Sequence, residues 1–179
     1  PYGISRLNVN TLPASIDKQT LYKETLALLH NPHTDHLFSY YLVELLLQFD
    51  TPSLVEDLIA LSAHRTIEIS RYETWAKHVK PEDMEHLRSL LHTTPSQQKF
   101  AIDTFATLQA SDKVNDVLKL LPTSDQKVER AILDFVAKTG NATQVAQLFP
   151  YLSEENSAVI YTLSQNPHPE LAPEVKALL

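Results

Sequence analysis

A run of possible metal ligands is the clearest chemical signal in the sequence. Three imidazoles and one carboxylate occur in the string HNPHTDHLF, at His30, His33, Asp35 and His36. Imidazole nitrogens and carboxylate oxygens ligate zinc and similar metals, so His30, His33 and His36 are candidate metal ligands. The string spans a helix end, a proline turn and a helix start. We therefore favour a structural role at two helix termini and predict no bound metal or cofactor.

One group of cations is the best candidate for a nucleic-acid contact. It consists of Arg65, Arg71, Lys77 and Lys80, and two glutamates interrupt it. The whole chain carries a formal net charge of -7, with 22 acidic and 15 basic residues. Proteins that bind nucleic acid normally present a basic face. The charge therefore argues against nucleic acid as a partner.

The composition also removes several catalytic devices. The chain has no cysteine, which excludes disulfides, thiolate nucleophiles and thiolate zinc sites. It has only 2 glycines, which argues against a glycine-rich phosphate loop. No nucleophile elbow or Ser-His-Asp spacing is present, so the sequence predicts a protein that is not an enzyme. The most apolar stretch, residues 37–49, contains polar residues and is too short to span a bilayer.

The elements that position these residues follow from an internal repeat of about 30 residues. Two apolar columns mark a first helix: Leu42, Tyr72, Ile102, Ile132, Ile160 and Leu45, Trp75, Phe105, Phe135, Leu163. Two more mark a second helix: Val55, Met84, Val114, Val145, Val175 and Leu58, Leu87, Val117, Leu148, Leu178. A further position follows at Leu91, Leu121 and Leu152. Each helix thus has one apolar stripe, which stacked helix pairs can bury in a continuous core.

The repeat predicts an all-α protein with five helix pairs. The pairs cover residues 35–62, 65–92, 96–121, 125–152 and 154–179, and a lone amphipathic helix precedes them at Asp17–His30. We expect residues 1–16 to form an irregular arm and residues 17–179 to form one domain. Because the chain starts at Pro1 and ends on two leucines, we expect it to be part of a larger protein. Helix N-caps are expected at Ser53, Ser96, Ser111, Ser124 and Ser153.

The aromatic residues are assigned largely to the core. Trp75 is the only tryptophan, and it shares its column with Phe105 and Phe135, so we expect it to be buried. The run Phe38, Tyr40, Tyr41 lies on a helix that is apolar nearly all round. The sequence leaves open whether that run is buried or faces a partner.

The repeat resembles HEAT repeats, in particular the short variety of phycobilisome-lyase-type proteins. The likeness lies in VERAILDFVAKTGNATQVAQLFPYLS and in the terminal NPHPELAPEVKALL, and it covers about residues 35 to 179. The resemblance implies a right-handed α-solenoid of about five HEAT-like pairs. It says little about function, because function depends on sites and not on the fold.

We expect a scaffold that binds a protein or a peptide on the face formed by the second helices. The expected contact residues precede the buried columns, in two rows: Asp57, His86, Asp116, Gln147 and Asp83, Lys113, Gln144. Their acidic and polar character favours a partner with basic or polar groups. The alternatives are a HEAT-like enzyme domain that binds a metal or processes nucleic acid, and an auxiliary factor for loading a chromophore.

Overall fold

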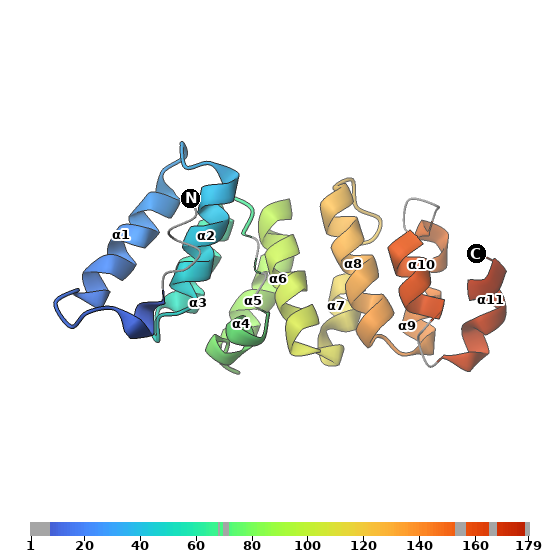
Figure 1. The fold of residues 1–179 in the computed structure, drawn as a ribbon. Coiled ribbons are helices and arrows are strands. Elements are labelled where there is room, and N and C mark those ends of the chain that lie inside the picture. Colours follow the sequence, from blue (N-terminus) through green and yellow to red (C-terminus); the bar gives the residue numbers. More distant parts are fainter. Residues whose placement is uncertain (1–7, 68, 70–71, 153–156, 165–167, 178–179) are drawn as a thin grey trace. The chain divides into compact units, whose positions relative to one another are not determined.

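The computed structural model describes residues 8–67, 69, 72–152, 157–164 and 168–177, and all regular elements among them are helices (Figure 1). The α-helices are α1 (Lys18–His30), α2 (His36–Leu46), α3 (Leu54–Ser62), α4 (Tyr72–His78), α5 (Asp83–Ser89), α6 (Pro95–Leu108), α7 (Val114–Leu118), α8 (Gln126–Thr139), α9 (Ala142–Ala146), α10 (Ser157–Ser164) and α11 (Ala172–Ala177). Short 3-10 helices are η2 (Val9–Thr11), η3 (Leu90–His92), η4 (Ser111–Lys113), η5 (Phe149–Tyr151) and η7 (Pro169–Leu171). The predicted all-α class is confirmed.

The lone N-terminal helix and the arm before it are both present. α1 begins after Asp17, whose carboxylate accepts a hydrogen bond from the Gln19 N–H at 3.1 Å. The arm is less irregular than predicted, because η2 buries Val9. The Val9 N–H donates to Gln48 Oε1 at 3.0 Å, which fastens the arm to the segment after α2. Residues 1–7 of the predicted arm lie outside the described residues.

The helix N-caps differ from those predicted. No predicted serine accepts a capping hydrogen bond among the described residues, and Ser153 lies outside them. The caps of the long helices are instead Asp17, Asp35, Thr94 and Asp125. Asp125, one position after a predicted serine, accepts from two backbone N–H groups. The three aspartate caps also interact favourably with the positive end of the helix dipole.

Two of the second helices are shorter than predicted. α7 ends at Leu118 and α9 ends at Ala146, so Leu121 and Leu152 lie outside them and are only half-buried. A proline shortly after each end limits how far either helix could continue. Pro122 disfavours helical backbone at the residue before it, and Pro150 lacks the N–H that a continuing helix would need.

The chain forms two compact units, one up to Leu87 and one from Arg88. The single domain over residues 17–179 stays a prediction. In the first unit, α1 packs against both α2 and α3. Its core contains the predicted column residues Leu42, Leu45, Leu58 and Trp75, all of them buried. The ring nitrogen Nε2 of His78 lies 3.1 Å from the Leu47 carbonyl oxygen and so connects α4 to the end of α2.

In the second unit the helices pack in two sets. α8 contacts both α6 and α10, and these three are the first helices of their predicted pairs (Figure 1). α7 contacts α9, and each of these two second helices also contacts α8. The predicted columns are buried here too, with the rings of Phe105 and Phe135 6.5 Å apart. The side chain of Val175 and all of Leu178 lie outside the described part of the structure.

Candidate functional site

The predicted contact residues of the second unit form part of a polar row across the second helices. Asp116 on α7 accepts from Arg88 Nε of α5 at 2.8 Å and from Lys119 Nζ at 2.8 Å. These two hydrogen bonds, the one from Lys119 foremost, hold the pKa of the Asp116 carboxyl below its usual value. The Asp116 side chain is only 19% exposed, so it is half-buried. Its charge is matched by cations, and the row is therefore not acidic.

The same row continues from α7 to α9 through two amides. Gln144 Nε2 donates to Asn115 Oδ1 at 2.8 Å. The side-chain Oε1 of Gln144 accepts from the Asn141 N–H at 2.9 Å, while the Asn141 side chain caps the start of α9. Gln144 is thus held in place by a capping box and by a neighbouring helix. Gln147, one turn further along, is exposed as predicted.

Three other predicted contact residues form hydrogen bonds or ion pairs with other groups of the chain. Asp57 accepts from the Tyr22 hydroxyl at 2.5 Å and from the Ser53 hydroxyl at 2.9 Å. Asp83 accepts from the Lys80 N–H at 2.7 Å. Lys113 pairs with the neighbouring Asp112 at 2.9 Å. The seventh predicted residue, His86, is exposed on α5.

The candidate metal ligands are not brought together. Among the described residues, no three His, Asp or Glu side chains lie close enough to hold an ion. Asp35 instead caps α2, where its Oδ1 accepts from the Phe38 N–H at 2.8 Å. The turn between α1 and α2 has its own hydrogen bonds: Asn31 Oδ1 accepts from the His33 N–H at 3.0 Å, and Thr34 donates to the Leu28 carbonyl at 2.5 Å. The string HNPHTDHLF thus builds a turn.

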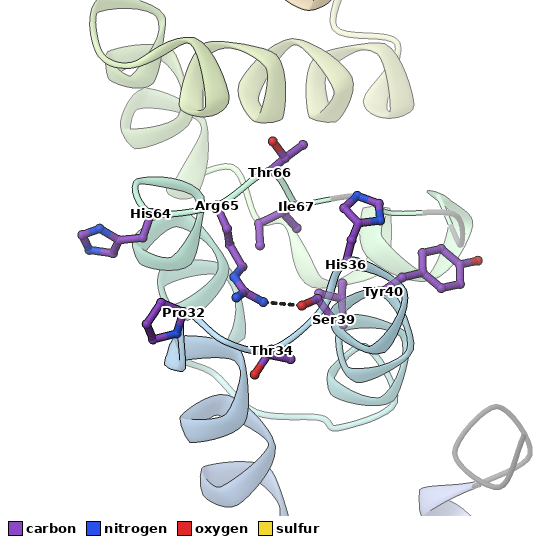
Figure 2. A pocket seen from close by; sticks show the side chains of 10 residues that line it. Pro32, Thr34, His36, Ser39, Tyr40, His64, Arg65, Thr66 and Ile67 are labelled. Atoms are coloured by element: carbon purple, nitrogen blue, oxygen red, sulfur yellow. Dashed lines mark hydrogen bonds between the residues drawn. The ribbon is translucent and has the colours of Figure 1, made fainter. Parts of the chain in front are cut away.

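Sequence reasoning missed a pocket of about 300 Å³ in the first unit (Figure 2). It lies between the α1–α2 turn, the first turns of α2 and the segment after α3, and it is lined by Pro32, Thr34, His36, Ser39, Tyr40, Val43, His64, Arg65, Thr66 and Ile67. Figure 2 shows the Arg65 guanidinium pointing toward Ser39. Arg65 donates to the Ser39 hydroxyl and, through Nη2, to the Asn31 carbonyl at 3.1 Å.

Arg65 was one member of the basic group considered for nucleic acid, and its side chain bonds within the first unit. Arg65 is half-buried and bonded to α2 and to the α1–α2 turn. Arg71 lies outside the described residues. Spacing along the sequence had no means of showing that Arg65 would meet Ser39, because 26 positions separate them.

A second cavity of the first unit, of about 660 Å³, adjoins Tyr22 and Asp57. Tyr22 is buried, and its ring lies edge-on to Phe49 at 5.4 Å. Burial foremost, and then the hydrogen bond to Asp57, raise the pKa of the Tyr22 hydroxyl well above its usual value. Tyr22 therefore stays protonated and serves as a donor to Asp57.

The aromatic residues divide between core and pocket. Trp75 is fully buried, which confirms the core prediction. Of the run on α2, Phe38, Tyr40 and Tyr41 are all half-buried, and the two tyrosine rings lie edge-to-face at 5.4 Å. Tyr40 lines the pocket of Arg65.

A comparison with known proteins found no matching family model, no matching curated protein and no matching solved structure. Within the described residues, no helix has the length and apolar character needed to cross a bilayer.

Proposed function

We propose that this chain is a non-catalytic α-solenoid module of HEAT-like helix pairs that binds a protein or a peptide on the exposed face of its second helices. The observation that carries the proposal is the polar row over α5, α7 and α9. Side chains of successive second helices bond to one another there, Arg88 to Asp116 and Asn115 to Gln144, at 2.8 Å each. Repeat arrays present extended binding surfaces that are built from side chains of successive repeats.

The row supports binding because its side chains are held before a partner arrives. Asn115 and Lys119 are exposed, and the residues that they bond are fixed by further hydrogen bonds. Binding of a partner then costs less conformational entropy, because the surface is already ordered. Since Asp116 is already paired with two cations, the expected partner is a polar segment that offers hydrogen-bonding groups, and not a strongly basic one.

Selection of binders from a random peptide library tests the proposal, followed by measurement of Kd by fluorescence anisotropy. The variant Gln147→Arg places a bulky cation on the exposed end of the row. Gln126→Arg makes the same change at an exposed position of the first helix α8. We expect Gln147→Arg to raise Kd at least about tenfold and Gln126→Arg to leave it unchanged, since about 1.4 kcal/mol corresponds to tenfold.

The opposite pattern would contradict the proposal. If the selected peptides bound both variants equally well, or lost affinity only with Gln126→Arg, the binding face would lie elsewhere. A selection that yields no peptide with Kd below about 1 mM, about 4 kcal/mol of binding free energy, would contradict the binding function itself.

A further inference from the structure

The charge of Arg65 has no anionic partner within the described part of the chain. Its two hydrogen bonds go to neutral acceptors, the Ser39 hydroxyl and the Asn31 carbonyl oxygen. A guanidinium has five N–H donors in a planar fork, so three remain for another acceptor. A half-buried cation that lacks a carboxylate is costly to desolvate, and an anion in the adjoining pocket would offset that cost.

The lining of the pocket favours an anion over a cation. None of its ten residues is an aspartate or a glutamate, although the whole chain carries a net charge of -7. Further donors line the pocket, the hydroxyl of Thr66 and the exposed ring of His64, and an imidazole offers at least one N–H. The lining residues that the structure describes therefore add no negative charge to the pocket.

The other residues that line the pocket suit the apolar part of a ligand. Val43 and Ile67 are buried side chains that line the pocket, and the ring of Tyr40 borders it. A volume of about 300 Å³ is at the lower end of the range of small-molecule sites. The pocket therefore has room for a compact organic ligand with one charged end.

We propose that this pocket binds a small organic anion through an oxyanion head, a carboxylate or a phosphate, held by the Arg65 fork. Arginine pairs with either group through two parallel N–H···O bonds. The apolar part of the ligand lies against Val43 and Ile67. The Ser39 and Asn31 acceptors orient the fork, because they hold one N–H of each terminal nitrogen and leave the others for the ligand.

Three probes of similar size test this site: benzoate, phenyl phosphate and the uncharged benzyl alcohol. Binding is followed by isothermal titration calorimetry and by NMR shifts of the Arg65 Nε–H and the His36 and His64 rings. We expect at least one anion to bind with a Kd below about 1 mM and at least about tenfold more tightly than benzyl alcohol. Benzyl alcohol lacks the charged contact, and a loss of about 1.4 kcal/mol of binding free energy raises Kd tenfold. The tighter of the two anions identifies the head group.

Two variants and one control complete the test. Arg65→Lys keeps the charge but removes the fork, and it weakens the anion at least about tenfold. His64→Asp adds a carboxylate at an exposed position of the rim, so like-charge repulsion weakens the anion without disturbing the core. Arg130→Lys, an exposed arginine on α8 in the other unit, leaves the affinity unchanged.

The proposal is overturned by any of three results. Benzyl alcohol binds as tightly as the anions, or neither anion binds below about 1 mM, or His64→Asp binds the anions as tightly as the native chain. If Arg65→Lys fails to fold, as judged by circular dichroism, His64→Asp still decides the matter. The site lies in the unit that ends at Leu87, so its failure leaves the peptide row of α7 and α9 untouched.

Discussion

Asp57, one of the contact residues expected from the sequence, also joins two helices through Tyr22. Asp57 lies on α3, and its carboxylate accepts from the Tyr22 hydroxyl of α1 across 35 positions of sequence. The bond is short, 2.5 Å, and it joins a charged acceptor to a buried donor. Hydrogen bonds to charged groups contribute more to stability than neutral ones. Asp57 therefore helps to hold α1 against α3, which contact each other.

The variant Tyr22→Phe removes that donor and leaves the ring in place. We expect the unfolding free energy at neutral pH to fall by about 1 to 3 kcal/mol, because Asp57 keeps only the Ser53 hydroxyl as a donor among its described contacts. Chemical denaturation, read from amides of α1 and α3 by hydrogen exchange, measures the change. Unchanged stability would mean that water replaces the lost hydroxyl at no cost.

The same tyrosine predicts a dependence on pH. The pKa of Tyr22 is raised in the folded chain, so above about pH 10 the unfolded chain loses the proton while the folded chain keeps it. The contribution is fully present below the unfolded pKa and is lost as pH rises toward the folded one. We expect stability to fall more steeply between about pH 9 and 11 in the native chain than in Tyr22→Phe. Parallel curves would contradict the raised pKa.

Two helix ends illustrate how backbone conformation and packing compete at the scale of an element. Gly140 follows α8 with an ordinary φ of -71°, so its lack of a side chain is not needed for the backbone angle. It is needed for space, because a Cβ there would lie 2.7 Å from the Val136 carbonyl oxygen. Gln109 follows α6 with a left-handed φ of 52°, where glycine would be favoured. The sequence thus has its glycine at the crowded end and a glutamine at the left-handed one.

Substitutions at these two ends should act in opposite directions. Gly140→Ala should cost about 1 to 3 kcal/mol, because the backbone must move to admit the methyl group. Gln109→Gly should raise stability by about 1 kcal/mol, because it removes the strain of a left-handed non-glycine residue. Denaturant unfolding measures both stability changes. The midpoints and m-values of the two variants are compared with those of the native chain. A stabilised Gly140→Ala would show that the turn yields easily.

At the scale of the whole molecule, each unit has a core of its own. Trp75 is fully buried in the first unit, and Phe135 is fully buried in the second. Both belong to the same apolar column of the repeat, so the one pattern serves two cores. The stability of each core should therefore depend on its own member of the column.

Truncation of these two side chains tests that dependence. Trp75→Ala and Phe135→Ala should each cost about 3 to 5 kcal/mol, since loss of burial and the cavity left behind add together. Hydrogen exchange should report the loss at amides of the unit that carries the substitution, which a global midpoint can hide. Gln147→Ala, at an exposed position, should change stability by less than about 0.5 kcal/mol. A neutral Trp75→Ala would contradict the column assignment.

The sequence by itself determined the helical class, the approximate helix pairs and the residues of the core. Leu42, Trp75, Phe105 and Phe135 are buried as their spacing predicts. This succeeds because the i, i+3, i+7 pattern is local and repeats about every 30 residues, so each copy supports the others. The N-cap predictions were wrong, although capping is also a local interaction. Serine and aspartate both cap helices, so adjacent candidates compete.

Only the tertiary structure decided which polar side chains meet. Arg65 joins Ser39 and Asn31, Asp57 joins Tyr22, and Gln144 joins Asn115. These partners lie 26 to 35 positions apart, and their encounter depends on how one helix packs against another. An apolar stripe specifies which face of a helix is buried, but several axial shifts and crossing angles bury that face equally well. The pocket of Arg65 and the row over the second helices both depend on those contacts between helices.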